Sequence, residues 1–159
     1  MPADSPPPIL VALDDDAGPA LRYAVDAAGR AGCALHLLHV VVPGSSPAAH
    51  ANGERLLHTA AVRARELAAG ASRVSTELAH AGPVPDVIVQ RASRSRQVVL
   101  QRRGGPGHGI TERSTCAEVA RHAACPVVLV PSPPDEEHPG TREAFVGLEV
   151  TPALPGALP

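Results

Sequence analysis

Short apolar runs alternate with amphipathic stretches along residues 9–131. Runs of strand length, rich in Val and Leu, cover residues 9–14, 34–42, 74–78, 97–101 and 127–130. Between them, apolar positions recur with helical spacing over residues 18–31, 53–70, 85–95 and 115–123. Because strands and helices alternate, the pattern predicts an α/β fold: five parallel strands in one open sheet with helices on both faces.

Two of the predicted helices carry specific expectations. The second is expected to begin at Gly53 and to bury an apolar stripe that includes Leu56 and Leu67. In the fourth, Thr115 and Glu118 match a capping box, in which a hydroxyl and a carboxylate satisfy free amides at the start of a helix.

The two ends differ in composition from the middle of the chain. Residues 1–8 hold four prolines, and residues 131–159 hold seven prolines and an acidic run. Such segments bury too little apolar surface to offset their ordering entropy. We therefore expect tails at residues 1–8 and 132–159 around one domain at residues 9–131. Within the second tail, residues 144–150 could form a short strand or a docking segment.

Overall composition excludes several classes of protein. A chain of 159 residues with a net charge of −2 has the length of one domain and no overall basic field for nucleic acid. No apolar run approaches the roughly 20 residues of a membrane span, and the N-terminal residues lack the pattern of a signal peptide. An odd count of three cysteines with no CxxC pair argues against a disulfide framework. We expect a cytoplasmic protein.

Neither metal binding nor catalysis is indicated by the sequence. Cys33, His36 and His39 have a suggestive spacing, but side chains alternate along a strand, so His36 points away from the other two. None of the common catalytic motifs is present, including the P-loop and the nucleophile elbow. We therefore expect no metal and no enzymatic activity.

Arginines concentrate in the second half of the domain. Residues 91–121 hold seven arginines against two glutamates, a net charge of +5. Beside a helix N-terminus, such side chains could bind an anion through their guanidinium forks. The other interpretation is a solvated loop with scattered charges.

Three segments together resemble the universal stress protein family: ILVALD at residues 9–14, LHLLHVV at 35–41 and STCAEVARHAACPVVLVP at 114–131. The resemblance implies strand order 3-2-1-4-5 and a homodimer paired along the last strand, from Val127 to Val130. An apolar edge strand of this kind is exposed unless it is paired. The resemblance also implies, in many members, an ATP site with a loop patterned G-x2-G-x9-G-[S/T] after the fourth strand.

This chain departs from that loop pattern. Counting back from Ser114 places Leu100, Arg103 and Arg113 at the three glycine positions. Sliding the register brings Gly104 or Gly105 to the middle position, but the outer positions keep their side chains. Glycines allow backbone amides to close on phosphate oxygens without a clash from Cβ. The phosphate-binding motif is therefore degenerate.

The candidate nucleotide-binding residues follow from the resemblance. They lie at the end of the first strand, on the second strand and at the start of the last helix: Leu13, Asp14, Val40, Arg113, Ser114 and Thr115. Asp14 would accept from the adenine or the ribose, or would simply cap the turn that follows. Val40 would pack on the adenine, or belong to the core. The hydroxyls of Ser114 and Thr115 could equally cap free amides, with Ser114 the stronger ligand candidate.

The leading functional interpretation is a universal stress-type protein that acts as a non-catalytic, dimeric stress-response regulator with weak or absent ATP binding and an unknown protein partner. The alternative is a true adenine-nucleotide-binding member, with slow ATPase activity, in which arginines replace the motif glycines. A third, weaker interpretation is an RNA-contacting module, although the arginine-rich segment lacks an aromatic side chain to stack on a base.

Overall fold

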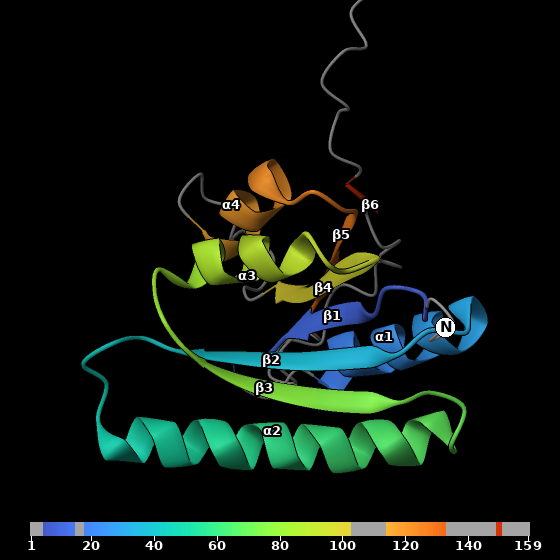
Figure 1. Ribbon diagram of the computed structural model, residues 1–159, viewed down its shortest axis with the longest axis horizontal. Helices are drawn as coiled ribbons and strands as arrows, with labels where there is room; N and C mark the ends of the chain where they lie inside the picture. Colours follow the sequence, from blue (N-terminus) through green and yellow to red (C-terminus); the bar gives the residue numbers. More distant parts are fainter. Residues whose placement is uncertain (1–4, 15–17, 103–113, 133–148, 151–159) are drawn as a thin grey trace, which may run out of the picture.

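Helices and strands alternate through the chain as the sequence predicts (Figure 1). The computed structural model describes residues 5–14, 18–102, 114–132 and 149–150. The strands are β1 (Ile9–Ala12), β2 (Leu35–Val41), β3 (Val74–His80), β4 (Gln97–Arg102), β5 (Val127–Pro131) and β6 (Glu149–Val150). The helices are α1 (Gly18–Ala31), α2 (Pro47–Ala68), α3 (Val84–Ala92) and α4 (Thr115–His122).

The five predicted strands form one parallel sheet in the order β3-β2-β1-β4-β5, which confirms the predicted fold class. A sixth strand adds to this order. β6 pairs antiparallel with β5, placing Val150 opposite Val127 and Glu149 opposite Val128. Residues 127–130 were expected to form an edge strand that pairs with a second copy; in the structure, Val127 and Val128 lie opposite β6. Residues 149–150 form part of the short strand considered for residues 144–150, and the remainder lies outside the described residues.

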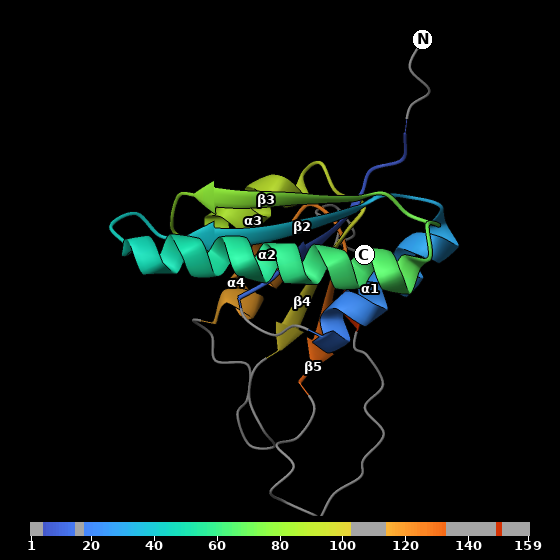
Figure 2. The ribbon, with the colours of Figure 1, turned by 90° about the horizontal axis from the view of Figure 1, so that it is seen from below.

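Two hydrophobic layers enclose the sheet. α1 and α2 cover one face, while α3 and α4 cover the other (Figures 1 and 2). β1 contributes to both layers, because Ile9 and Val11 face α1 and α2 while Leu10 faces α3 and α4. All three are at most 1% exposed, as expected of a central parallel strand.

Helix α2 begins six residues before the predicted start. Ser46 is its N-cap, with Oγ accepting from the amide of Ala49 at 3.2 Å, and Pro47 occupies the first turn. Gly53 therefore lies inside the helix, where it is buried. Leu67 was expected in the buried stripe, but it is 43% exposed. Gly53 was misinterpreted as the start of the helix, whereas in the structure it allows α2 to pack closely against the sheet.

Helix α3 ends three residues earlier than predicted. Ser93 Oγ donates to the carbonyl of Gln90 at 2.7 Å, and Ser95 Oγ donates to that of Arg91 at 2.9 Å. These hydroxyls satisfy backbone carbonyls of the last turn, in place of the amides that a longer helix would supply. The helix accordingly stops at Ala92.

A polar cluster ties the edge strand β3 to β2 and α3. Glu77 on β3 accepts a bidentate pair of bonds from Arg91 on α3, with Nη2 at 2.6 Å and Nε at 2.9 Å. His36 on β2 contacts Glu77 Oε2 through Nε2 at 3.0 Å and Ser75 Oγ through Nδ1 at 2.8 Å. The hydrogen bond from Arg91 is the main reason that the pKa of Glu77 lies below its usual value; burial opposes this, and His36 assists it.

Candidate functional site

The carboxyl ends of β1 and β4 mark the place where chain order reverses in the sheet. β1 continues to β2 on one side, and its other neighbour is β4. In open α/β sheets, ligands bind outside the strand ends at this switch point. The predicted residues Leu13, Asp14 and Ser114 follow β1 or precede α4, so the fold brings their backbones to this end of the sheet.

Backbone and side-chain hydrogen bonds hold Leu13 in place. Its amide donates to the carbonyl of Leu38 at 2.8 Å. Its carbonyl oxygen lies 2.7 Å from Nδ1 of His39. A carbonyl can only accept, so His39 carries its proton on Nδ1. Leu13 itself is 4% exposed, so its side chain belongs to the core, and only its backbone borders the site.

Asp14 is exposed and its charge reaches the first turn of α4. Burial is the main reason that the pKa of the Cys116 thiol is raised, and the carboxylate of Asp14 adds to the effect. The guanidinium of Arg102 acts in the opposite direction on the same thiol. Asp14, Arg102 and Cys116 therefore share one electrostatic environment between the ends of β1 and β4 and the start of α4.

Ser114 caps helix α4. Its Oγ accepts from the amide of Ala117 at 3.1 Å, and its carbonyl accepts from the amide of Glu118 at 3.0 Å. The capping box assigned to Thr115 and Glu118 is thus wrong by one residue, since Thr115 is already the first helical residue and is exposed. Ser114 still has its hydroxyl hydrogen to donate.

Val40 lies on the face of the sheet covered by α3 and α4. It is half-buried and packs against the cluster that includes Leu38 and Leu100, as does the half-buried Ala12 at the end of β1. Both interpretations from the sequence therefore remain open for Val40: it contacts the core, and part of its surface is available to a ligand.

Gln101 spans the end of the sheet on the opposite face. Its Oε1 accepts from the amide of Ala20, in the first turn of α1, at 3.2 Å. Its Nε2 donates to Oγ of Ser132 at 3.2 Å, and Ser132 Oγ donates to the carbonyl of Arg102 at 2.8 Å. The side chain of Gln101 thus joins α1, β4 and the residue after β5.

The arginine-rich segment is divided between the two ends of the sheet. Arg94 and Arg96 lie between α3 and β4, at the amino end of β4, while Arg102 lies at its carboxyl end. Six strand residues at roughly 3.3 Å each separate the two ends. Arg91 and Arg121 are bonded to Glu77 and Glu118. The described arginines therefore do not form one cationic patch.

Some of the predicted site cannot be placed. Arg113, Arg103 and the loop glycines lie outside the described residues. Three described residues lie near the site without having been assigned to it from the sequence: His39, which was weighed only as a metal ligand, Cys116 and Gln101. Their roles depend on which backbone groups the fold brings beside them, and local sequence carries no signal for that.

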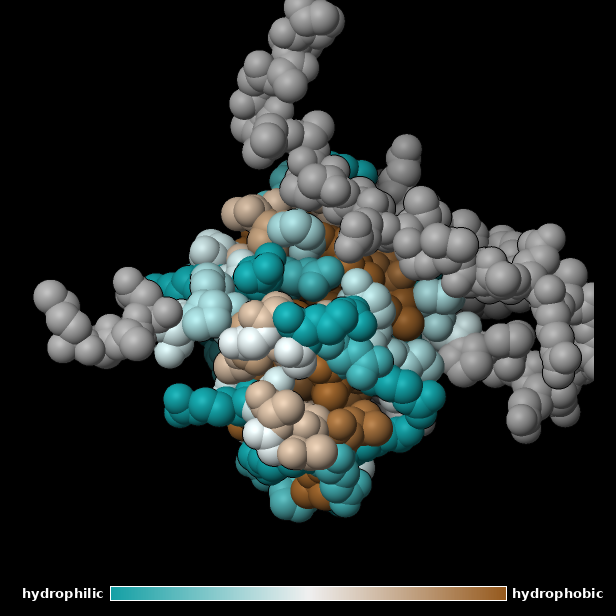
Figure 3. Space-filling view, turned by 90° about the vertical axis from the view of Figure 1, so that its right-hand side faces the viewer, coloured by the Kyte–Doolittle hydropathy of each residue, from teal (hydrophilic) through white to brown (hydrophobic). Residues whose placement is uncertain are grey.

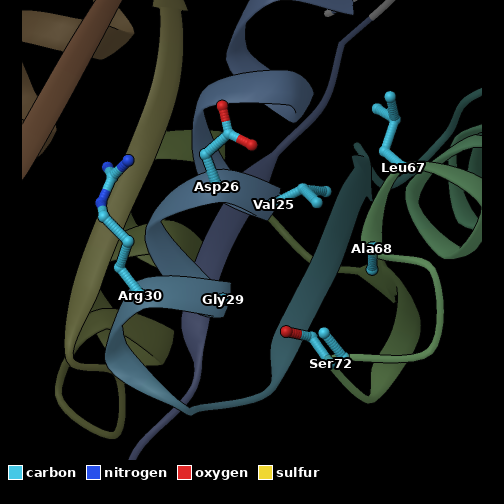
Figure 4. Close-up of a pocket in the computed structure, with 8 residues that line it drawn as sticks. Val25, Asp26, Gly29, Arg30, Leu67, Ala68 and Ser72 are labelled. Carbon is cyan, nitrogen blue, oxygen red and sulfur yellow. The ribbon is translucent and has the colours of Figure 1, made fainter.

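A pocket of about 310 Å³ lies at the other end of the molecule, between the last turns of α1 and α2 (Figure 4). Val25 points from α1 toward α2, where Leu67 and Ala68 line the pocket, while Arg30 points away. The Oγ atom of Ser72 is buried there without a hydrogen-bond partner. Figure 3 views this end and shows hydrophobic side chains exposed among hydrophilic ones. The pocket lies at the amino ends of the strands, so it is separate from the candidate site.

In the described part of the chain, no group of three His, Cys, Asp or Glu side chains is arranged to hold a metal ion. None of the described helices is long and apolar enough to cross a membrane.

The fold and the position of the candidate site define an open α/β domain with its site at the topological switch point. The sequence profile of the universal stress protein family matches residues 7–131, and the chain belongs to this family. No curated protein gives a significant sequence match.

Solved structures of the same family are similar. The universal stress protein from Archaeoglobus fulgidus is 24% identical with a TM-score of 0.65, covering 77% of this chain and 96% of its own. A second structure of that protein, in complex with dAMP, has the same identity and TM-score and covers 77% and 95%. A family member from Burkholderia pseudomallei is 27% identical with a TM-score of 0.60, covering 82% and 100%.

Proposed function

We propose that this chain is a non-catalytic regulator of the universal stress type, in which the site at the carboxyl ends of β1 and β4 binds an adenine nucleotide weakly or not at all. The regulator acts as a homodimer and signals to a protein partner. A bound nucleotide biases that interaction by favouring one arrangement of the residues around the site.

The class of ligand is supported by the similar fold and by the chemistry of the site. The relative from Archaeoglobus fulgidus has been solved with dAMP. In this chain, Asp14 offers a carboxylate to hydroxyl or amino donors, Val40 offers an apolar surface to a base, and Ser114 offers a hydroxyl donor at a helix N-terminus. That N-terminus adds a favourable dipole for a phosphate group.

Weak binding is supported above all by Gln101. When Gly104 takes the middle position of the loop pattern, the first glycine position falls on Gln101, whose side chain is hydrogen-bonded to both Ala20 and Ser132; when Gly105 does, it falls on Arg102. Leu100, the position in the unshifted register, lies within β4 and is 4% exposed. None of these residues can offer the bare backbone that a phosphate-binding glycine loop provides.

The absence of catalysis is supported by the groups beside the site. Burial and the charge of Asp14 raise the pKa of Cys116, which disfavours the thiolate that nucleophilic chemistry needs. Ser114 Oγ already accepts from a backbone amide, and the hydrogen bonds of Ser114 within the described residues include none to a general base.

The test is calorimetric titration of the purified protein with ATP and Mg²⁺ at moderate salt, with AMP as the comparison. We expect no heat, or a dissociation constant weaker than about 10 µM, which corresponds to about 7 kcal/mol. Tighter binding would contradict the proposal and favour the alternative, an adenine-nucleotide-binding member in which arginines replace the glycines.

The position of the Arg102 side chain favours this alternative. Its charge lowers the pKa of Cys116, so its guanidinium acts on the start of α4, where a phosphate would lie. Under the alternative, Arg102→Gln weakens nucleotide binding, while Arg94→Gln at the opposite end of β4 does not. Arg113→Gly discriminates further: it strengthens binding if that side chain obstructs the loop, and weakens binding if it holds the phosphate.

A further inference from the structure

The outer edge of β5 has very few hydrogen-bond donors. The amide of Val98 donates to the carbonyl of Pro126, and the amide of Ser132 donates to that of Arg102, so Pro126 and Ser132 face β4. Backbone groups alternate in direction along a strand. Val128 and Val130 therefore also face β4, while Val127, Leu129 and Pro131 face away from it. Proline has no N–H, so Val127 and Leu129 carry the only outward donors of β5.

β6 occupies one of these two positions. Val150 lies directly opposite Val127 in the antiparallel register, which allows the two residues to exchange backbone hydrogen bonds. Glu149 lies opposite Val128, where the backbone groups of an antiparallel pair point away from one another. The described part of β6 thus uses Val127 and leaves Leu129.

A second copy of this chain needs the same position. In a symmetric antiparallel pairing of two β5 strands centred on Val128, Val127 of each copy lies opposite Leu129 of the other. Any register that uses both outward donors of a copy uses Val127. β6 and a second β5 therefore exclude one another.

We propose that β6 is an intramolecular guard of the β5 edge, so that the chain dimerises through β5 only when β6 is released. This inference rests on the homodimer proposed above and adds its regulation. The surface is the outer edge of β5, and its partner is the β5 strand of a second copy.

The pairing of β5 with β6 and its pairing with a second copy compete according to the effective concentration of each partner strand. Seventeen residues, 132–148, separate β5 from β6 in the sequence, and the entropic cost of bringing the two ends of a chain segment together grows only slowly with its length. A tethered segment has an effective concentration on the order of millimolar, whereas a second copy is present at micromolar concentration. The described β6 is only two residues long, so it holds the edge through this advantage in concentration and can be displaced.

The test changes the backbone of β6 in the full-length protein. Val150→Pro removes the amide that faces Val127, whereas Glu149→Pro removes one that faces away from β5 and serves as the matched control. Sedimentation velocity from about 1 to 200 µM brackets the concentrations at which the two pairings compete. We expect wild type and Glu149→Pro to be monomeric in the low micromolar range, and Val150→Pro to dimerise at least about tenfold more tightly.

The location of the dimer is tested by a second substitution. Leu129→Pro, added to Val150→Pro, removes one of the two outward donors of β5, and with it half of the hydrogen bonds of the symmetric pairing, without removing an amide that faces β4. It should therefore return the protein to monomer. Persistence of the dimer would overturn the assignment to β5.

The other outcomes also distinguish the two proposals. If wild type and Val150→Pro dimerise equally, β6 is not a guard, although a homodimer remains. If both are monomeric throughout, the guard and the proposed homodimer both fail. If Glu149→Pro dimerises as Val150→Pro does, pairing at Val127 is not the cause. Calorimetry with nucleotide judges the binding site separately from all of these.

Discussion

His39 on β2 holds the carbonyl oxygen of Leu13, the residue before Asp14, through an Nδ1 contact of 2.7 Å. The imidazole ring in turn lies below Gly53 of α2, where a Cβ atom would come within 2.7 Å of His39 Cδ2. A glycine in the helix therefore leaves room for the histidine, and the histidine positions the end of β1 at which the candidate site begins.

Replacing His39 should loosen this end of β1. We expect His39→Ala to lower the free energy of unfolding by about 1–3 kcal/mol, because it removes one hydrogen bond and leaves space beneath α2. His39→Asn keeps a donor near the position of Nδ1 and should recover part of the loss. Urea denaturation measures both variants, and equal losses for the two would contradict the role of the hydrogen bond.

The two interior helix glycines, Gly53 and Gly29, should respond to alanine with opposite signs. Gly53→Ala places Cβ 2.7 Å from the His39 ring and 2.9 Å from Leu78 Cδ1, so we expect a destabilisation of about 1–3 kcal/mol. Gly29→Ala meets nothing within 4 Å and should stabilise α1 by about 0.5–1 kcal/mol. Chemical denaturation of both variants checks the prediction, which fails if both shift the same way.

Glu77 should make stability depend on pH in the acid range. Its pKa in the folded protein is lowered, first by the hydrogen bond from Arg91. Its contribution is therefore fully present above the unfolded pKa, near 4.5, and is lost as pH falls through the lower folded value. We expect Glu77→Gln to cost about 1 kcal/mol at pH 7 and progressively less below pH 4.5.

Thermal or urea unfolding across pH 3–7 measures this difference. Glu66→Gln, on the exposed side of α2, is the control and should leave the profile unchanged. A difference between wild type and Glu77→Gln that persists undiminished at pH 3 would contradict the ion-pair explanation.

The alkylation rate of the Cys116 thiol should depend on the charges of the candidate site even when no ligand is bound. Burial, and then Asp14, raise the pKa of its thiol, so alkylation at pH 8 should be slow. Asp14→Asn should accelerate the reaction and Arg102→Gln should slow it, each by less than the tenfold change that about one pKa unit would give. Peptide mass spectrometry after timed iodoacetamide treatment follows Cys116 separately from the buried Cys33 and Cys125. Equal rates in all three proteins would mean that these charges do not act on the thiol.

Two of the sequence-based predictions failed because the deciding contact was distant along the chain. Gly53 was interpreted as a helix start because glycine disfavours helix interiors, but its role is to accommodate a ring from β2. The arginines were close in sequence, yet β4 passes between them and carries Arg96 and Arg102 to opposite ends of the sheet. The capping residue of α4 was misplaced by one position because Ser114 and Thr115 are adjacent and both residue types are favoured as caps.

The candidate site was predictable only in part. The ends of β1 and the start of α4 could be located, because in a parallel sheet both lie at the carboxyl edge. The hydrogen bonds of Gln101 to Ala20 and Ser132 join residues 81 and 31 positions apart, and no local pattern indicates such a pairing.

The sequence by itself determined the class of fold, the order of its elements and the two-sided burial of the sheet. These follow from hydrophobic periodicity and from the alternation of strands and helices, both of which are local properties of the chain. Only the tertiary structure decided which polar groups meet at the end of β1, which arginines stay near the candidate site, and that β6 covers Val127 of the β5 edge. Each of these depends on backbone groups brought together by the packed sheet, and such contacts exist only once the chain has folded.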